Sequence, residues 1–306
     1  MPAKQRGRSS LIYASLCASL FALVSQPTRI SANSKGSSAD IADIANNPDN
    51  VGKYAEIHLA VTRGNVGRLQ ELLASGVDAD QRTEEGFSTL HIAVARSQPE
   101  IVRLLLEAGA DVSIGDRMAQ HTPLHLACVA GNVQVVQLLL EHAADTEQAD
   151  KAGFYPFHHA VAHKNIEVAE HLLKHGFDAN IASHKDGVTA LHMAAEFNHI
   201  EIIELLLSHG AAVDQPDFNK LTPLHRATMA DNRAAALILL NWGADVLAEN
   251  NEGRTPLKSA QQMSHNRTVE ILQKHAREEA EMMMAVRAEL TDKRKRQATA
   301  AADVWS

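Results

Sequence analysis

A histidine returns along this chain at an almost constant interval of 33 or 34 residues. The recurring residues are His58, His91, His125, His158, His192 and His225, and Lys258 takes the next position. Alanine stands two positions after each of these seven residues, and leucine stands fourteen positions after each. A period of that length is typical of proteins built from stacked repeats, so the chain is expected to hold about seven of them.

Each repeat carries signals for two short helices. In TPLH, residues 122–125, the threonine is placed to act as an N-cap and the proline suits the first helical position. A second apolar stretch, VQVVQLLLEH at residues 133–142, has the spacing of a buried helical face. Glycine then closes most repeats, where helices commonly end in a left-handed residue. Aromatic residues make up only 4% of the chain, which favours closely packed helices.

The segments TPLHLA and TPLHRA, residues 122–127 and 222–227, resemble the T-P-L-H-x-A signature of the ankyrin repeat. Looser copies in the other repeats extend the resemblance over about residues 51–275. It implies an all-α solenoid of helix-turn-helix units with β-hairpin loops, a concave face, and binding of other proteins. Ala143 replaces the usual glycine and Tyr155 the usual threonine, so their junction is expected to be the least regular.

The six recurrent histidines are interpreted as structural hydrogen-bonding groups between turn and helix, since a catalytic residue does not recur in every repeat. The chain contains no nucleotide-binding, nucleophile-elbow or kinase motif, and its flanks are too short for a separate catalytic domain. An enzyme is therefore not expected.

Two histidine pairs, His159 with His163 and His171 with His175, have the four-residue spacing of two metal ligands on a helix. The repeat pattern fixes no cysteine or acidic third ligand beside either pair. The sequence therefore predicts no metal and no cofactor.

Binding in such a repeat protein is expected at the turn tips and on the exposed side of the first helix. Exposed aromatic, methionine and arginine side chains are enriched at interface centres. The expected partner-binding residues, by register with the family, are Arg63, Phe87, Arg96, Met118, Phe154, His163, Lys185, Glu196, Phe197, Phe218, Met229 and Arg254. The stretch from Phe154 to Phe218 is expected to be the centre of contact with a protein partner on the concave and hairpin face.

Charge argues against nucleic acid as a partner. Residues 40–275, the predicted repeat domain, carry 18 Lys and Arg against 31 Asp and Glu. An acidic surface repels phosphate backbones, so no nucleic-acid binding is expected.

The two ends bear on location. Residues 1–39 hold five basic residues and no acid, with an uncharged stretch at residues 11–24, which has the plan of a secretory signal peptide followed by a linker. The expected function is a secreted or lumenal adaptor, with a membrane involved only if this leader is uncleaved. The alternatives are mitochondrial or plastid import, or an intracellular scaffold or inhibitor with a disordered N-terminus.

Residues 276–306 are predicted to form a charged helix and tail. Leu272, Ala276, Met283, Val286 and Leu290 lie on one rough stripe that is expected to cap the stack. The basic run KRKR at residues 293–296 is interpreted as a solvated tail, with a nuclear import signal as the alternative.

Overall fold

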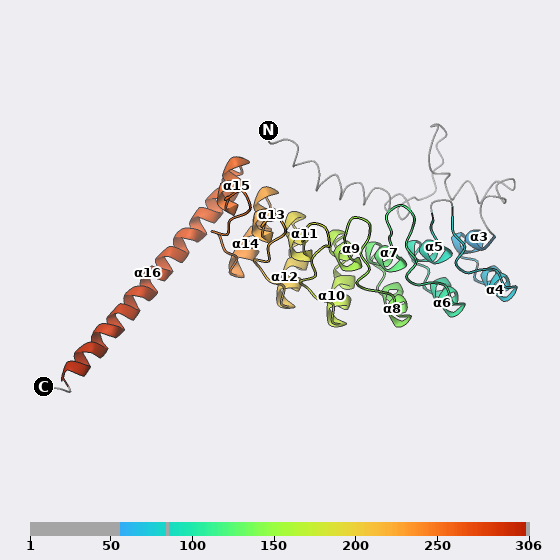
Figure 1. Cartoon of the computed structure of the whole chain (residues 1–306), viewed down its shortest axis with the longest axis horizontal. Helices are drawn as coiled ribbons and strands as arrows, with labels where there is room; N and C mark the ends of the chain where they lie inside the picture. Colours follow the sequence, from blue (N-terminus) through green and yellow to red (C-terminus); the bar gives the residue numbers. More distant parts are fainter. Residues whose placement is uncertain (1–55, 84–85, 304–306) are drawn as a thin grey trace. The chain divides into compact units, whose positions relative to one another are not determined.

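A computed structural model describes residues 56–83 and 86–303 of the chain (Figure 1). In that part of the chain the regular secondary structure is α-helical, and the helices follow one another in pairs, one pair to each sequence repeat. The expected all-α repeat architecture of about seven repeats is confirmed. The predicted leader at residues 1–39 lies outside the described residues.

The first helix of each pair carries the recurrent histidine or lysine. These helices are α3 (Glu56–Thr62), α5 (Thr89–Ala95), α7 (Pro123–Ala130), α9 (Pro156–Ala162), α11 (Ala190–Glu196), α13 (Pro223–Met229) and α15 (Pro256–Gln262). The second helix of each pair carries the leucine run. These helices are α4 (Val66–Ala74), α6 (Pro99–Glu107), α8 (Val133–Glu141), α10 (Ile166–Lys174), α12 (Ile200–Ser208), α14 (Arg233–Asn241) and α16 (Asn266–Asp303).

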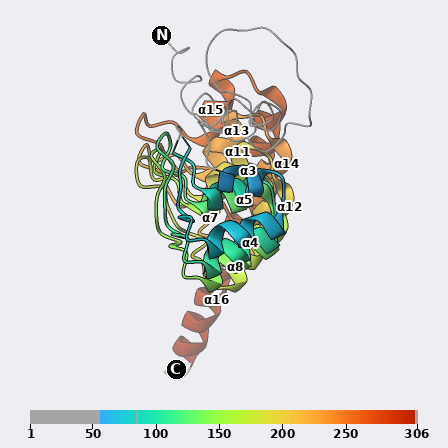
Figure 2. The ribbon, with the colours of Figure 1, turned by 90° about the vertical axis from the view of Figure 1, so that its right-hand side faces the viewer.

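The described chain divides into two compact units. The N-terminal unit runs to Asp178 and includes Ser183–Lys185, and the C-terminal unit comprises Ala179–Ala182 and the chain from Asp186 onward. In the N-terminal unit α5 packs on α3 and α7, and α6 packs on α4 and α8. Figure 2 shows these as two layers of helices, with the hairpin loops of the unit projecting to one side. In the C-terminal unit α13 packs on α11 and α15, and α14 packs on α12 and α16.

The recurrent alanines and leucines form the core. Ala93 and Ala127 are fully buried. Their small side chains let neighbouring first helices approach closely. Leu105 and Leu139, from the second helices, are also fully buried. Burying a leucine contributes about 1.5–3 kcal/mol, so repeating it in every unit stabilises the stack without any large aromatic core.

The helix starts follow the sequence signals. Ser88, Thr122, Thr189 and Thr222 are N-caps whose side-chain oxygens accept a hydrogen bond from the backbone N–H of the histidine three residues later. Tyr155 stands at this position before α9 and lacks a short hydroxyl, yet its backbone N–H still donates to His158 Nδ1 at 3.3 Å. The start of α9 is therefore preserved without the usual threonine.

The second helices end in left-handed residues. Gly109 has a φ of 86° and Gly176 a φ of 87° at this position, and Ala143 takes the same place after α8 with a φ of 60°. An alanine in this conformation is strained, because its Cβ approaches its own backbone. The irregularity expected at this junction therefore includes local strain at Ala143.

The last helix, α16, continues without a break from the second helix of the final pair into the predicted C-terminal segment. Leu272 is buried, but Met283 is 65% exposed and Leu290 is 54% exposed. The expectation that the whole stripe caps the stack is wrong, because the helix extends past the helices that it packs against. Among the described helices, no stretch is both long and apolar enough to cross a membrane.

Candidate protein-binding surface and the buried histidine cluster

The recurrent histidines connect each helix start to the following hairpin. His91 Nδ1 accepts a hydrogen bond from the backbone N–H of Ser88 at 3.1 Å, and His91 Nε2 donates to the carbonyl oxygen of His121 at 2.8 Å. Burial lowers the pKa of His91 to about 4, so the ring is neutral at pH 7 and Nδ1 can accept. One or both of these bonds are made by His58, His125, His158, His192 and His225.

A buried aspartate supports the hairpin tip from inside. Asp150 Oδ1 accepts hydrogen bonds from the N–H groups of Ala152 at 2.8 Å and Phe154 at 2.9 Å. Asp217 holds the corresponding loop of the C-terminal unit in the same way. Asp116 and Asn250 support their own loops through similar hydrogen bonds from backbone N–H groups. The residue after each of these four supports stands at the tip and is exposed; these tip residues are Arg117, Lys151, Phe218 and Asn251.

Neighbouring tips within a unit are joined through the backbone. Lys151 N donates to the carbonyl oxygen of Ala119 at 2.7 Å in the N-terminal unit. Phe218 N donates to the carbonyl oxygen of Asp186 at 2.9 Å in the C-terminal unit. These bonds fix the tips relative to one another, so their side chains are presented from a rigid support.

The structure exposes some of the predicted contact residues and partly covers others. The exposed residues are Arg63, Arg96, Met118, Lys185 and Phe218, with 64% of Met118 and 66% of Phe218 accessible. The half-buried residues are Phe87, His163, Glu196, Phe197, Met229 and Arg254. The surface is therefore carried mainly by the hairpin tips.

Phe154 does not belong to this surface. Its side chain is only 3% exposed, and its ring lies 5.6 Å from that of His158. The expectation that Phe154 is accessible is wrong because it directly precedes the N-cap position, where the side chain turns inward. The sequence held a signal for this, since the equivalent Val188 is apolar and also buried.

Arg226 ties two acidic side chains together in the C-terminal unit. It donates to Asp217 at 2.7 Å and to Glu196 at 3.2 Å. Burial raises the pKa of Glu196, and the adjacent guanidinium opposes that rise. Glu196, one of the expected contact residues, is thus half-buried and paired with Arg226 inside the protein.

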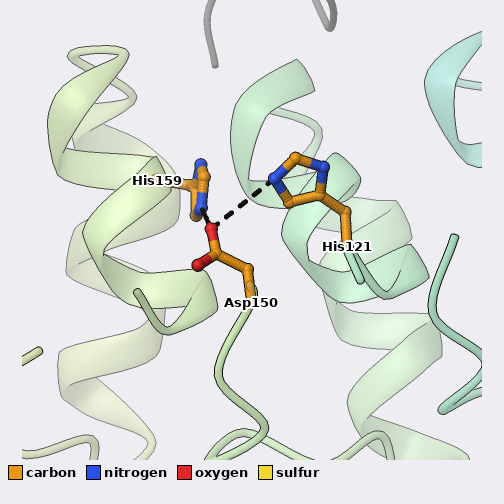
Figure 3. Close-up of side chains that lie close together, drawn as sticks. All are labelled: His121, Asp150 and His159. Atoms are coloured by element: carbon orange, nitrogen blue, oxygen red, sulfur yellow. Dashed lines mark hydrogen bonds and ion pairs between the residues drawn. The ribbon is translucent and has the colours of Figure 1, made fainter. Parts of the chain in front are cut away.

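A second network lies in the N-terminal unit, where two histidines converge on one carboxylate oxygen (Figure 3). His159 Nε2, from α9, lies 2.9 Å from Asp150 Oδ2. His121 Nε2, from the loop before α7, lies 3.5 Å from the same oxygen and has no hydrogen-bond partner. The side chains of His121, Asp150 and His159 are all buried.

A second carboxylate lies behind His121. Asp116 Oδ2 is 3.3 Å from His121 Nδ1 and also accepts the backbone N–H of His121 at 2.9 Å. Burial opposes ionisation of Asp116, but hydrogen bonds from His121 and Ala119 outweigh it and lower the pKa to about 2. Burial likewise acts to lower the pKa of His121, and the two carboxylates, Asp116 and Asp150, raise it to about 9. Burial lowers the pKa of His159.

A family model described as ankyrin repeats (3 copies) matches residues 32–116, 114–183 and 157–250, which together exceed half of the chain. The chain belongs to the ankyrin repeat family. Human protein phosphatase 1 regulatory subunit 27 is 42% identical over 57 residues, which are 19% of this chain and 37% of that protein. Human ankyrin repeat and SOCS box protein 16 is 37% identical over 73 residues, 24% of this chain and 16% of that protein. The chain thus matches well under half the length of these curated relatives.

Solved ankyrin repeat domains share the fold over a longer stretch. The domain of Bcl-3, described as a unique member of the IkappaB protein family, has a TM-score of 0.64 at 31% identity and covers 72% of this chain and 98% of that one. The human ASB11 domain has a TM-score of 0.63 at 27% identity, with the same coverage. The ankyrin repeat fold is typically a non-catalytic scaffold that binds protein partners.

The acidic partner of His159 is Asp150, and its position in the repeat explains why the two residues meet. Asp150 lies nine residues before His159, as Asp217 lies nine residues before Arg226. No acidic ligand was expected beside His159 and His163, but Asp150 contacts His159, because the hairpin of this repeat folds its aspartate back onto its own first helix, as Asp217 does in its repeat. The repeated nine-residue spacing was the signal that could have revealed the pair.

Proposed function

We propose that this ankyrin repeat protein is a non-enzymatic adaptor that binds a protein partner through its hairpin tips. The observation that carries the proposal is the placement of Phe218. Its ring is 66% exposed yet lies directly over Gly187 of the preceding hairpin, where a Cβ atom would meet the ring at 2.6 Å. An exposed aromatic ring on a rigid support loses little conformational entropy on binding, which favours its use as an interface anchor.

The N-terminal unit presents a different but compatible chemistry. Met118 is exposed at a tip beside Arg117, and the next tips in this unit carry the exposed cations Lys151 and Lys185. A flexible apolar side chain surrounded by cations suits a partner segment that combines acidic and apolar residues. The exposed arginines of the first-helix side, Arg63 and Arg96, extend the same charge.

The test compares tip variants with an off-site control. The double variant Met118→Ser/Phe218→Ser removes both exposed apolar tips, and Leu237→Ser changes a 44% exposed residue on α14 instead. Wild-type protein and Leu237→Ser are expected to retain a partner cross-linked and purified from the native host, while the tip variant loses it. Equal retention by all three proteins would refute the tip surface as the binding site.

We further propose that the adaptor enters the secretory pathway. The proposal rests on Lys4, Arg6 and Arg8, which precede the uncharged stretch at residues 11–24, an order typical of a signal peptide. The test is the mature N-terminal sequence of protein recovered from its host, together with the fraction that contains it. A start near Gln26 or Asn33 in the medium or in vesicles supports secretion. An intact Met1 or Pro2 in cytosol overturns it and makes an intracellular scaffold or inhibitor the working function.

A further inference from the structure

The geometry points to a binding site for a divalent transition-metal ion, best suited to Zn²⁺, formed by His121 Nε2, His159 Nε2 and Asp150 Oδ2 inside the N-terminal unit. The three ligand atoms lie within 4.8 Å of one another. No helix spacing alone creates this set, because its members come from two hairpins and one helix (Figure 3). The site is distinct from the hairpin tips proposed to bind protein.

The distances agree with a tetrahedral ion. Ligand atoms bound at about 2.0–2.1 Å to tetrahedral zinc are separated from one another by about 3.3 Å. The two separations from Asp150 Oδ2 are 2.9 Å to His159 Nε2 and 3.5 Å to His121 Nε2, on either side of that value. The two Nε2 atoms lie within 4.8 Å of each other, so closing the set to tetrahedral separations needs a relative movement of at most about 1.5 Å.

Asp150 is arranged to offer one oxygen only. Its Oδ1 is occupied by the backbone N–H groups of Ala152 and Phe154, so the carboxylate cannot rotate without breaking the hairpin. Its Oδ2 faces both rings. A monodentate carboxylate with two imidazoles is a common protein ligand set for zinc, with water completing the coordination in sites that have three protein ligands.

A second observation, the unpaired ring nitrogen of His121, also indicates a bound ion. Its side chain is 5% exposed, and its Nε2 has no hydrogen-bond partner although it faces Asp150. Asp116, fixed by the backbone N–H groups of Met118 and Ala119, contacts the opposite ring nitrogen. A carboxylate behind a metal-binding histidine orients the ring and selects the tautomer whose other nitrogen binds the ion.

A metal-free explanation competes with this one, in which His121 is a cation paired with Asp116 and Asp150. That arrangement gives His121 Nε2 only a long contact of 3.5 Å, with the oxygen that already pairs with His159 at 2.9 Å. Bound zinc satisfies all three ligand atoms at once. The two explanations differ in whether the folded protein binds zinc in a saturable manner at these rings.

The experiment titrates the full-length protein with Co²⁺ and with Zn²⁺. The chain supplies its own matched variant, because Val188 and Arg226 stand to Asp217 in the C-terminal unit as His121 and His159 stand to Asp150. In the double variant His121→Val/His159→Arg the buried Asp150 can still pair with a cation, as Asp217 does with Arg226. We expect one Co²⁺ per wild-type chain, with the intense visible absorption of a four-coordinate site, and Zn²⁺ binding at least about 100-fold weaker in the variant.

Two further measurements keep the result decisive. The variant His171→Gln/His175→Gln removes another histidine pair, and its Zn²⁺ affinity should equal that of wild type; loss of binding there places the metal elsewhere and overturns the proposal. Nitrogen NMR of the wild-type histidine rings should show Zn²⁺ shifting His121 and His159 but not His192, whether or not the double variant folds. Absence of saturable Zn²⁺ binding, or shifts confined to other rings, also overturns it.

Discussion

Arg226 and Asp217 form a buried ion pair of 2.7 Å that closes the hairpin of their repeat onto its first helix. The Asp217 side chain is fully buried, and the Arg226 side chain is only 11% exposed. Removing one partner leaves an uncompensated buried charge, so Arg226→Leu is expected to lower the free energy of unfolding by about 3–5 kcal/mol. Urea denaturation followed by circular dichroism measures the change.

The matched control for this pair is Glu196→Gln. Glu196 also contacts Arg226 but is 21% exposed, and its amide can still accept a hydrogen bond. Losing the Glu196–Arg226 ion pair is expected to lower the free energy of unfolding by no more than about 1 kcal/mol, as for partly exposed ion pairs. Similar losses of unfolding free energy in Arg226→Leu and Glu196→Gln would show that Asp217 is not the main stabilising partner of Arg226.

Ala143 offers a stabilising change. It adopts the left-handed conformation, with a φ of 60°, that glycine adopts after α4, α6, α10, α12 and α14. Relief of the strain outweighs the added freedom of the unfolded chain, so Ala143→Gly is expected to raise the free energy of unfolding by about 0.5–1 kcal/mol.

Gly176→Ala is the reverse change at the same position of the next repeat. The φ of Gly176 is 87°, and nothing lies within 4 Å of an added Cβ atom, so this variant tests backbone strain alone. It should lose about 1 kcal/mol in the same thermal or urea measurement. An unchanged or less stable Ala143→Gly protein contradicts the strain at Ala143.

The repeat period explains why so much of the fold could be read from the sequence. The spacing of His91, Ala93 and Leu105 recurs in the repeats. The histidine marks a capped helix start, the alanine a close approach of two helices, and the leucine a buried helical face. The nearest-neighbour character of such stacks makes local rules sufficient for the fold. The sequence also indicated the exposed tips at Met118 and Phe218 correctly.

Properties set by single positions were harder to read. Phe154 looks like an interface residue by type, but its burial follows from its place before the N-cap. The partners His121 and Asp150 lie 29 residues apart and meet only because successive hairpins stack. The part of α16 that contacts the repeats depends on where the neighbouring helices end. The sequence of α16 alone does not show where that contact stops.

Stability should depend on pH through His192. Burial is the main cause that lowers its pKa to about 4, with Arg226 also lowering it and Asp217 and Asp186 opposing the change. Since its unfolded value is 6.5, the unfolded chain binds the extra proton first as the pH falls. The stabilisation is therefore complete above pH 6.5 and is lost progressively between about pH 6.5 and 4, by about 3 kcal/mol.

His192→Gln isolates this contribution, because glutamine does not titrate in that range. The wild-type protein is expected to be the more stable of the two at pH 7, and the gap should close towards pH 4. Urea midpoints measured at several pH values give the difference directly. A gap that stays constant across the series would mean that the proton uptake of His192 is the same in both states.

Phe154 and Phe218 should separate core from surface in one comparison. Phe154 is 3% exposed and fills a position beneath the hairpin, so Phe154→Ala is expected to lower the free energy of unfolding by about 3–5 kcal/mol. Phe218 is 66% exposed, so Phe218→Ala should change stability by no more than about 0.5 kcal/mol while weakening partner binding. Differential scanning calorimetry with a parallel binding assay distinguishes the two effects. If Phe154→Ala kept full stability and lost the partner instead, the buried placement of its ring would be wrong and the contact surface would extend to that hairpin.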